Sequence, residues 1–403
     1  MPTRAPLRAW FAACALAVPI AAWAQERAAG EIVDAIVQDG PRAMAIRSSA
    51  DVVRFEQQAR LAFPNPGVMY SREGAGFTEF LQLEQPLPIF GIRAALSRAG
   101  IAATAAAEAE RDARLWDLRT EAERLVNRWL WAQAQVEATS TDTRAVERLV
   151  EVLRVREREG EGSRFDRLRA EQEVADLKQA AVAAAIELSD TRAAVAALLP
   201  PGVTITRVTG VLDGARMPLD REALVARARA ARAELRALQF GHDRTALEAE
   251  AARRSRWPAP VISGGLKPAD TDIDRERGGV FGLNVTIPLF DAGGRDAARW
   301  TAEGARIMAE RAAIEHHVRT DVVRAAETLA LRQQAITGAD DDTAAELVTT
   351  AEVAYREGEI GIVVLLDAVR AASRARLRDL ERRLDVRLAE IALERAVGER
   401  LWP

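Results

Sequence analysis

Few residues in this chain could perform chemistry, and their spacing does not bring them together. The only adjacent histidines, His316 and His317, would diverge by about 100° on a helix, so they could not both bind one metal ion. His242 is the only other histidine, and a coordination site needs more ligands than it adds, which favours solvated or lumen-facing histidines. We find no phosphate-binding glycine loop, Ser/His/Asp set or paired-carboxylate motif. The sequence therefore predicts no catalytic residue, no metal site and no cofactor, and an enzyme is disfavoured.

The carboxylates have a structural interpretation. Asp340, Asp341 and Asp342 are predicted to start a fresh helix, with their charges at its positive end, and attraction of cations is the alternative. Most other acids stand as i,i+4 partners of arginine along helices. After residue 24 the chain has 54 basic and 60 acidic side chains, a formal charge of −6. Nucleic-acid binding would concentrate positive charge, so it is disfavoured.

Residues 1–24 are predicted to be a secretory signal peptide. Arg4 and Arg8 precede the apolar run 10–20, and Ala22-Trp23-Ala24 is a small-x-small cleavage site. Cys14, the only cysteine, would leave with the signal, so the mature chain would have no thiol. Lipidation at Cys14 and an uncleaved helical anchor are the alternatives. The apolar run is too short to span a bilayer as a helix.

The remainder contains an internal duplication. Pro88 and Pro288 lie in similar Pro-Leu/Ile-Phe contexts 200 residues apart, and two Arg-Glu-Gly-Glu tetrads begin 198 residues apart, at 158 and 356. A near-constant offset indicates that a whole unit was copied. Each unit is predicted to contain a helix, a strand hairpin, a very long helix, a tight turn and a returning helix. The expected helices are 31–63, 94–157, 164–199, 220–256, 295–355 and 362–400, with an interruption of the second at 139–142.

Two hairpins interrupt the helical pattern. The first is predicted from 68–72 and 77–85 around a glycine-containing turn, and the second from 258–266 and 279–287 around a polar loop, 267–278. In the last strand Phe281, Leu283, Val285 and Ile287 point one way, while small and polar residues point the other. This period and length are typical of a tilted outer-membrane strand whose apolar residues face lipid. A half-buried strand of a soluble sandwich is the alternative. A short β-like run, 203–208, lies in the linker between the units.

These elements imply an assembly. The long amphipathic helices need partner helices to cover their apolar stripes, and four strands are too few to close a barrel, which needs roughly eight. An open sheet in lipid would leave edge N–H and C=O groups unpaired. Several copies around an axis would solve both problems and would enclose a conduit.

The motifs resemble the TolC-like outer-membrane efflux proteins, most closely the outer-membrane components of heavy-metal RND pumps. The resemblance is carried by Gln85-Pro86-Leu87 through Arg93, by Ile287-Pro288-Leu289-Phe290-Asp291-Ala292-Gly293-Gly294-Arg295, and by Ala354-Tyr355-Arg356-Glu357-Gly358 with Leu365-Leu366-Asp367-Ala368. It implies a homotrimer with a 12-stranded outer-membrane β-barrel, continued by a periplasmic α-helical barrel. A periplasmic adaptor (membrane fusion protein) and an inner-membrane RND-type pump would be the partners. The strand-to-helix junctions would lie at Pro88, Arg93, Pro288, Gly294 and Arg295.

The resemblance also places the gate. The turns at Gly160-Glu161 and Gly358 would be the periplasmic tips, which narrow the pore and dock the adaptor, and Tyr355 fits a position beside them. Asp367 fits an acidic position near the constriction, where three copies would form a cation-favouring ring, although a solvated helix charge is an equal alternative. Ile360 and Val364 depart from the polar residues of many channel-type members, so an ionic latch at those two positions is not expected.

The predicted fold is therefore mainly α with a small β part, in a duplicated architecture. The expected divisions are a signal peptide (1–24), a first repeat (25–199), an equatorial linker (200–218) and a second repeat (219–403). Each repeat begins with a helix. In the first repeat the strand hairpin is expected at about 66–88 and the helical hairpin at about 91–199, and in the second repeat at about 258–288 and 291–400. The predicted function is a passive outer-membrane duct of a tripartite efflux system in a Gram-negative bacterium, possible cargo being heavy-metal cations. A soluble periplasmic coiled-coil scaffold or adaptor is the alternative.

Overall fold

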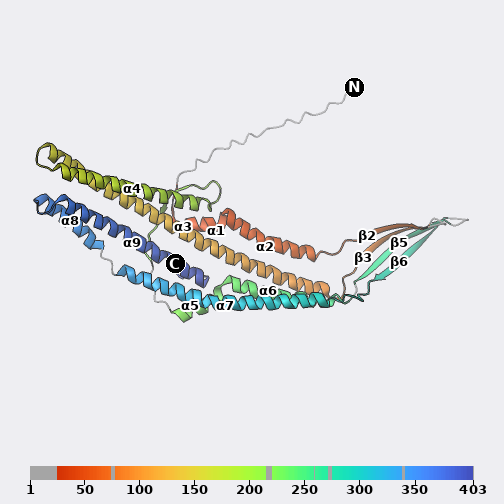
Figure 1. Cartoon of the computed structure of the whole chain (residues 1–403). Helices are drawn as coiled ribbons and strands as arrows, with labels where there is room; N and C mark the ends of the chain where they lie inside the picture. Colours follow the sequence, from red (N-terminus) through yellow and green to blue (C-terminus); the bar gives the residue numbers. More distant parts are fainter. Residues whose placement is uncertain are drawn as a thin grey trace, which may run out of the picture.

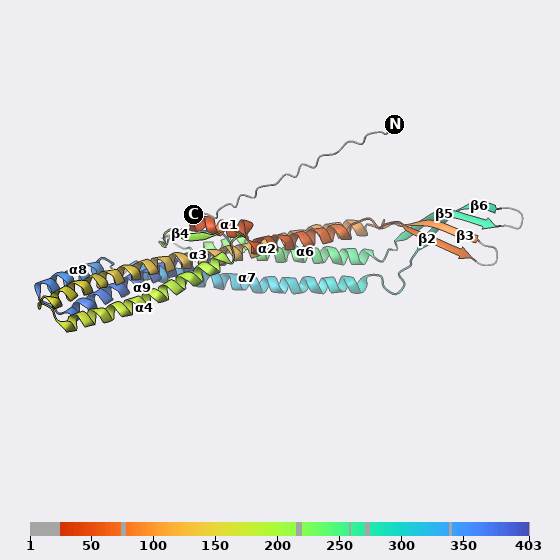
Figure 2. The same ribbon diagram turned by 90° about the horizontal axis from the view of Figure 1, so that it is seen from above.

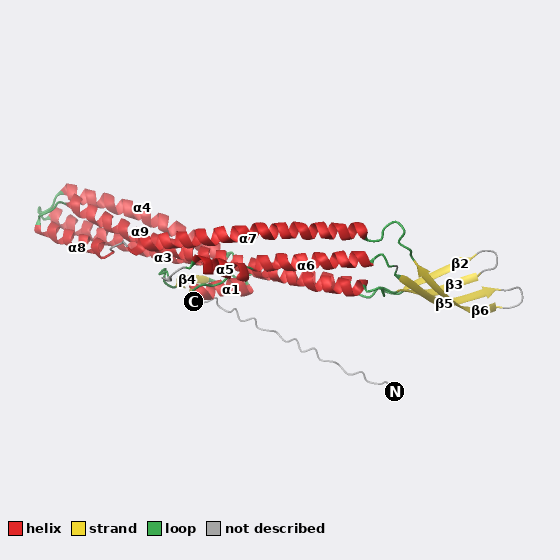
Figure 3. Cartoon of the chain, turned by 90° about the horizontal axis from the view of Figure 1, so that it is seen from below, coloured by secondary structure: helices red, strands yellow, loops and turns green. Residues whose placement is uncertain are grey.

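A long helical shaft carries a small sheet at one end, as the computed structural model shows (Figure 1). The structure describes residues 25–402, with gaps at 74–77, 215–219, 258, 271–274 and 338–340. The predicted signal peptide, both strand-connecting turns and Asp340 lie outside the described residues. Figures 2 and 3 show the sheet at one end and the α3–α4 and α8–α9 turns at the other. At 1.5 Å per residue, the 67 residues of α3 span about 100 Å.

Each half of the chain supplies the predicted series of elements. The first comprises β1 Gln25–Ala28, α1 Ala29–Asp39, α2 Pro41–Arg60, β2 Gly67–Glu73, β3 Thr78–Pro86, α3 Ile92–Arg158 and α4 Arg164–Ala196. The second comprises β4 Ile205–Thr209, α5 Arg221–Ala231, α6 Ala233–Arg254, β5 Pro260–Asp270, β6 Arg275–Val285, α7 Gly294–Thr337, α8 Asp341–Glu357 and α9 Ile362–Val397.

Two helices expected to be continuous are broken at equivalent places. The stretch 31–63 divides at Gly40, which has an extended backbone and precedes Pro41, the first residue of α2. The stretch 220–256 divides at Arg232, whose extended conformation starts α6. There the Arg232 Nε–H donates to the Ala396 carbonyl at 2.8 Å, so the break satisfies the end of α9. The periodicity of apolar residues along one segment could not predict either break.

The expected interruption of α3 at 139–142 was wrong. The helix continues through this stretch, and the Thr139, Thr141 and Thr143 hydroxyls donate to carbonyls four residues earlier without breaking it. Asp142 is turned toward α9 instead of capping a new helix. By contrast, the expected outward helix 295–355 is two helices, and the predicted fresh start at the aspartate run is confirmed at Asp341.

The four-stranded sheet is antiparallel throughout, in the order β2-β3-β5-β6. The strands β5 and β6 extend farther than predicted, because Lys267 pairs with Gly278 and Asp270 with Arg275 inside the supposed polar loop. Polar residues at the outer end of a strand do not end its ladder. A second sheet, which sequence reasoning missed, pairs β1 with β4 in parallel across 180 residues of chain.

Three apolar clusters hold the helices together. One surrounds the fully buried Trp129 and joins α1, α3 and α4 to β4. A second joins α5, α7, α9 and Trp402 near the chain end. The third lies toward the helical tips, where Leu153 of α3 meets Leu366 of α9. The apolar stripes of the long helices are thus only partly covered within one chain.

Candidate functional site

The two strand-to-helix junctions have the same local structure. The Ile89 N–H donates to the Leu87 carbonyl at 2.9 Å, and the Leu289 N–H donates to the Ile287 carbonyl at 3.0 Å. Pro88 and Pro288 are the central residues of these three-residue turns, because a fixed φ near −65° suits an inverse γ-turn. Both prolines therefore turn the chain from a strand toward a long helix.

Each junction then needs a glycine. Gly91 and Gly293 both have φ of +75° and directly precede the starts of α3 and α7. A β-carbon at Gly293 would collide with the Ala252 carbonyl of α6, so glycine is required on two grounds. Asp291 accepts a hydrogen bond from the Gly293 N–H at 2.9 Å. Sequence reasoning selected Gly294, which is the first helical residue, and missed that the strained position is Gly293.

The junction arginines differ between the repeats. Arg93 donates to the Leu61 carbonyl at 2.6 Å, and its guanidinium lies 5.1 Å from the centre of the Phe63 ring. It therefore closes the end of α2 onto the start of α3. Arg295, at the equivalent place in α7, is exposed.

One face of the sheet is apolar and exposed. Directly paired residues of antiparallel strands share a face of the sheet. Apolar side chains meet on one face in the pairs Val68–Leu83, Tyr70–Leu81, Leu81–Leu266 and Ile262–Leu283. Phe281 and Leu283 are 78% and 62% exposed, and Val285 is exposed too. The opposite face carries Ser71, Gln82, Glu84, Ser263, Gly282 and Asn284, together with the apolar Met69, Phe80, Val261 and Val280. Ile287 is exposed and lies just beyond the end of β6.

The two helical turns at the far end have identical hydrogen-bond patterns. Gly160 has φ of +79° and donates to the carbonyl three residues back, and Glu161 donates to the carbonyl five residues back. Gly358 has φ of +81° and, with Glu359, repeats both bonds. Only glycine takes this left-handed conformation without strain, which explains the repeated Arg-Glu-Gly-Glu sequence.

The first turn is reinforced by charge. Arg167 of α4 lies 2.5 Å from Glu157 of α3 and 2.7 Å from Glu171, and Arg154 of α3 reaches Glu171 at 3.1 Å. Hydrogen bonds from Arg167 and Arg154 lower the pKa of Glu171. Glu161 itself is exposed. The α3–α4 tip is thus tied across its two helices.

The second turn is held mainly by apolar packing. Tyr355 and Ile360 pack against the third cluster, and burial, followed by the Asp166 charge, raises the pKa of Tyr355. Asp367 is exposed, as is Val364 at 54%. One chain therefore brings Tyr355 next to Gly358 at the tip but leaves Asp367 facing solvent.

Two buried carboxylates join α9 to the first repeat, and sequence reasoning missed both. Glu173 of α4 pairs with Arg370 of α9 and is 3% exposed. Asp142 of α3 accepts from Ser373 Oγ at 2.6 Å and from Arg376, both on α9. The only sequence signal was a polar run in the middle of a predicted helix. These contacts fix the second hairpin against the first.

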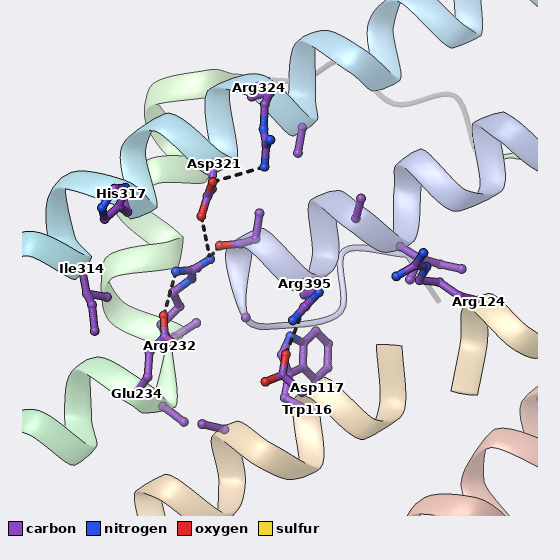
Figure 4. Close-up of a pocket in the computed structure, with 18 of the residues that line it drawn as sticks. Trp116, Asp117, Arg124, Arg232, Glu234, Ile314, His317, Asp321, Arg324 and Arg395 are labelled. Atoms are coloured by element: carbon purple, nitrogen blue, oxygen red, sulfur yellow. Dashed lines mark hydrogen bonds and ion pairs between the residues drawn. The ribbon is translucent and has the colours of Figure 1, made fainter. Parts of the chain in front are cut away.

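A cavity of about 890 Å³ lies midway along the shaft, between α3, the α5–α6 connection, α7 and α9 (Figure 4). Its wall carries many charges, most of them paired, such as Asp117 with Arg395 at 3.0 Å and Glu234 with Arg232 at 2.7 Å. His317 lines it and His316 is its neighbour in the chain, 6.2 Å away between ring centres. Among the described residues no group of three or more His, Cys, Asp and Glu could hold a metal ion.

Within the described part of the chain, no helix is both long and apolar enough to cross a membrane.

A duplicated helical shaft that ends in a sheet with one exposed apolar face defines a protein that passes from water into a membrane. The sequence model of the outer membrane efflux protein family matches residues 64–200 and 224–399. The chain therefore belongs to the outer membrane efflux protein family, and it is an outer-membrane efflux channel protein with a large periplasmic part. The TolC-like resemblance is confirmed.

Solved structures share this fold. CusC, described in a study of folding and transmembrane channel formation, aligns with a TM-score of 0.73 and 15% identity over 92% of each chain. The CmeC outer membrane channel of Campylobacter jejuni gives 0.72 and 12%, over 93% of this chain and 87% of that one. The MtrE outer membrane channel of Neisseria gonorrhoeae, in its open state, gives 0.71 and 18%, over 93% and 89%. No curated protein matches by sequence.

Proposed function

We propose that this protein is the passive duct of a tripartite efflux system, and that it works as a homotrimer without catalysing a reaction. The observation that carries the proposal is the incompleteness of the single chain. Its sheet has free edges at β2 and β6, and one face of that sheet carries a row of exposed apolar side chains. Three copies would give twelve strands, enough to close a barrel and pair every edge.

The helices support the same assembly. Exposed apolar residues stand at both ends of one face of α4, on alternating three- and four-residue steps, with Gln172, Ala175 and Gln179 at the steps between them. They are Phe165 and Leu168 at one end and Val182 and Ile186 at the other, between 48% and 63% exposed. This spacing is that of a coiled-coil seam, which needs a partner helix. The position of α4 at one side of the shaft leaves the seam available to a neighbouring copy (Figure 1).

The residues at the junctions support a position for the membrane surface. Phe90 and Trp257 are exposed with ring centres 5.9 Å apart, and Arg256 lies 5.5 Å from the Trp257 ring. Leu289 and Phe290 are exposed at the second junction. Aromatic side chains gather at membrane–water interfaces, with basic groups toward the water. This supports lipid contact by Phe281, Leu283 and Val285 of β6 and by Ile287 at the junction turn itself.

The opposite end of the shaft is the proposed gate and docking surface. The rigid α3–α4 tip, with Gly160 and Glu161, would present the adaptor with a fixed edge, and the α8–α9 tip, with Tyr355 and Gly358, would move. Three copies of the exposed Asp367 would form an acidic ring that favours cations, in line with the heavy-metal cations suggested by the resemblance. The energy for transport would come from an inner-membrane RND-type pump.

Reconstitution tests the duct directly. Purified full-length protein added to a planar lipid bilayer should give stepwise conductance, and three-copy complexes should persist in mild detergent. Recovery of the mature chain as a monomer in the soluble periplasmic fraction would contradict the proposal and would favour a scaffold or adaptor.

A further inference from the structure

The cavity at mid-shaft lies on one side of the helices. On α3, at 3.6 residues per turn, the cavity-wall residues Trp116 and Arg124 lie on one side of the helix. The opposite side carries Leu118, Ala122 and Trp129, which pack against the peripheral elements α1 and β4. On α9, likewise, the wall residues Leu388 and Arg395 lie opposite Val386, Leu393 and Val397, which pack with α5. If the shaft closes around an axis in the proposed trimer, this cavity faces the conduit, so the role assigned to the cavity rests in part on the proposed function.

The acids of the cavity wall all have partners within the described residues. Asp117 is bound by Arg395 at 3.0 Å, Asp321 by Arg324 at 3.3 Å, Glu234 by Arg232 at 2.7 Å and Asp112 by Arg111 at 2.8 Å. Figure 4 shows the first three of these pairs.

Two guanidinium groups of the same wall have no such partner. Arg124 of α3 and Arg236 of α6 line the cavity and are exposed, and in the described part of the chain neither makes an ion pair or a side-chain hydrogen bond. The wall has five arginines against four acids, so the charge left over is positive. An open arginine with no carboxylate is a ready donor for a carboxylate, sulfonate or phosphate group.

Apolar side chains complete the wall. Trp116, Ile314 and Leu388 lie between the charged groups and are only partly exposed. Apolar area combined with a few polar groups is typical of small-molecule sites. Among the described residues the cavity offers no group of three or more metal-ligating side chains, and its two unpaired guanidinium groups would repel a cation.

The size of the cavity suits a small organic molecule. Its wall on α3 runs from Asp112 to Arg124, which is about 18 Å at 1.5 Å per residue. Dividing the volume of about 890 Å³ by this length gives a mean cross-section of about 50 Å², wide enough for one flat ring system lying along the shaft.

We propose that this cavity is a binding station for organic anions with a flat apolar body, which adds an anionic class of cargo to the duct. The acid group would bind Arg124 or Arg236, and the ring system would lie against Trp116.

Calorimetric titration of the full-length protein in nanodiscs tests the proposal with three naphthalene probes. These are 2-naphthalenesulfonate, the neutral 2-naphthalenemethanol and the cationic 2-naphthylmethylammonium. We expect the anion to bind at least fivefold more tightly than the other two. The double variant Arg124→Gln/Arg236→Gln should weaken the anion about tenfold, whereas Arg148→Gln, an exposed arginine of α3 outside the cavity, should bind like the unmodified protein.

Equal binding of the three probes, or an unchanged anion affinity in the double variant, would overturn the binding station. The circular dichroism spectrum of each variant checks that it is folded. The wall residues named above all lie on this chain, so the probes can be titrated against the monomer as well as the trimer. Absence of conductance with intact anion binding would refute the duct alone, and conductance without selective anion binding would refute the station alone.

Discussion

The buried Asp142 should hold the second helical hairpin onto the first. Its carboxylate, in a residue 8% exposed, accepts from Ser373 Oγ at 2.6 Å and from the Arg376 guanidinium. Hydrogen bonds to a charged group contribute about 1.5–3 kcal/mol each when buried. The Arg376 side chain is 44% exposed, so its bond is screened and we assign it about 1 kcal/mol. Asp142→Asn keeps the volume and one acceptor, and should cost about 2 kcal/mol of local stability.

Native-state hydrogen exchange measures this cost. The opening free energy of α9 amides near Ser373 and Arg376 should fall by about 2 kcal/mol in Asp142→Asn and by about 1 kcal/mol in Arg376→Gln. A double-mutant cycle of the two should give a coupling of about 1 kcal/mol. The matched control is Lys178 of α4 with Glu147 of α3, 2.8 Å apart but 60% and 42% exposed, where the coupling should stay below about 0.5 kcal/mol. Equal couplings for the two pairs would refute the reasoning, because burial would then add nothing.

Three other outcomes follow from the same geometry. Gly358→Val, at φ +81°, should lower the free energy of opening of the tip, measured by hydrogen exchange, by about 1–2 kcal/mol. Gly361→Val, at φ −84°, should lower it much less. Similar losses in the two variants would show that the left-handed turn is not needed. If this face meets the bilayer, Leu283→Arg should reduce the free energy of folding into lipid vesicles by about 2–4 kcal/mol, while Asn284→Arg on the opposite face should reduce it little. A denaturant titration that ranks the two variants the other way would reverse the assignment of the faces. Burial, and then the Glu394 charge, raise the pKa of Glu123 above 4.5 against the opposing charges of Arg119, Arg400 and Arg387. The folded chain therefore keeps this proton to higher pH than the unfolded chain, and it loses stability as the pH rises from 4.5 through the raised pKa. The thermal midpoint of Glu123→Gln relative to the unmodified protein should increase over that range, and a constant difference would contradict the shift.

The sequence predicted the features that depend on neighbouring residues. The helical stripe of α3, the returning helices α4 and α9, and the glycine turns at Gly160 and Gly358 follow from periodicity and from the need for positive φ. The strand alternation around Phe281 and Leu283 likewise needs only local pattern. The duplication then doubled the information, because each half could be compared with the other.

The features that the sequence could not predict depend on contacts between distant segments. The β1–β4 pair joins residues 180 positions apart, and the break at Arg232 is explained by a carbonyl of α9. Asp142 was interpreted as a helix breaker because Ser, Thr and Asp usually compete for the backbone, yet its acceptors are used by α9. At the junction, the need for Gly293 rather than Gly294 follows from the nearby carbonyl of Ala252.

The most direct test of the channel is an electron cryo-microscopy reconstruction of the protein extracted from membranes. Three chains should surround an open axis, with β2 of each chain hydrogen-bonded to β6 of the next and the Leu283 face inside the detergent belt. A single chain whose β2–β6 sheet lies outside the detergent, with no central opening, would contradict the channel.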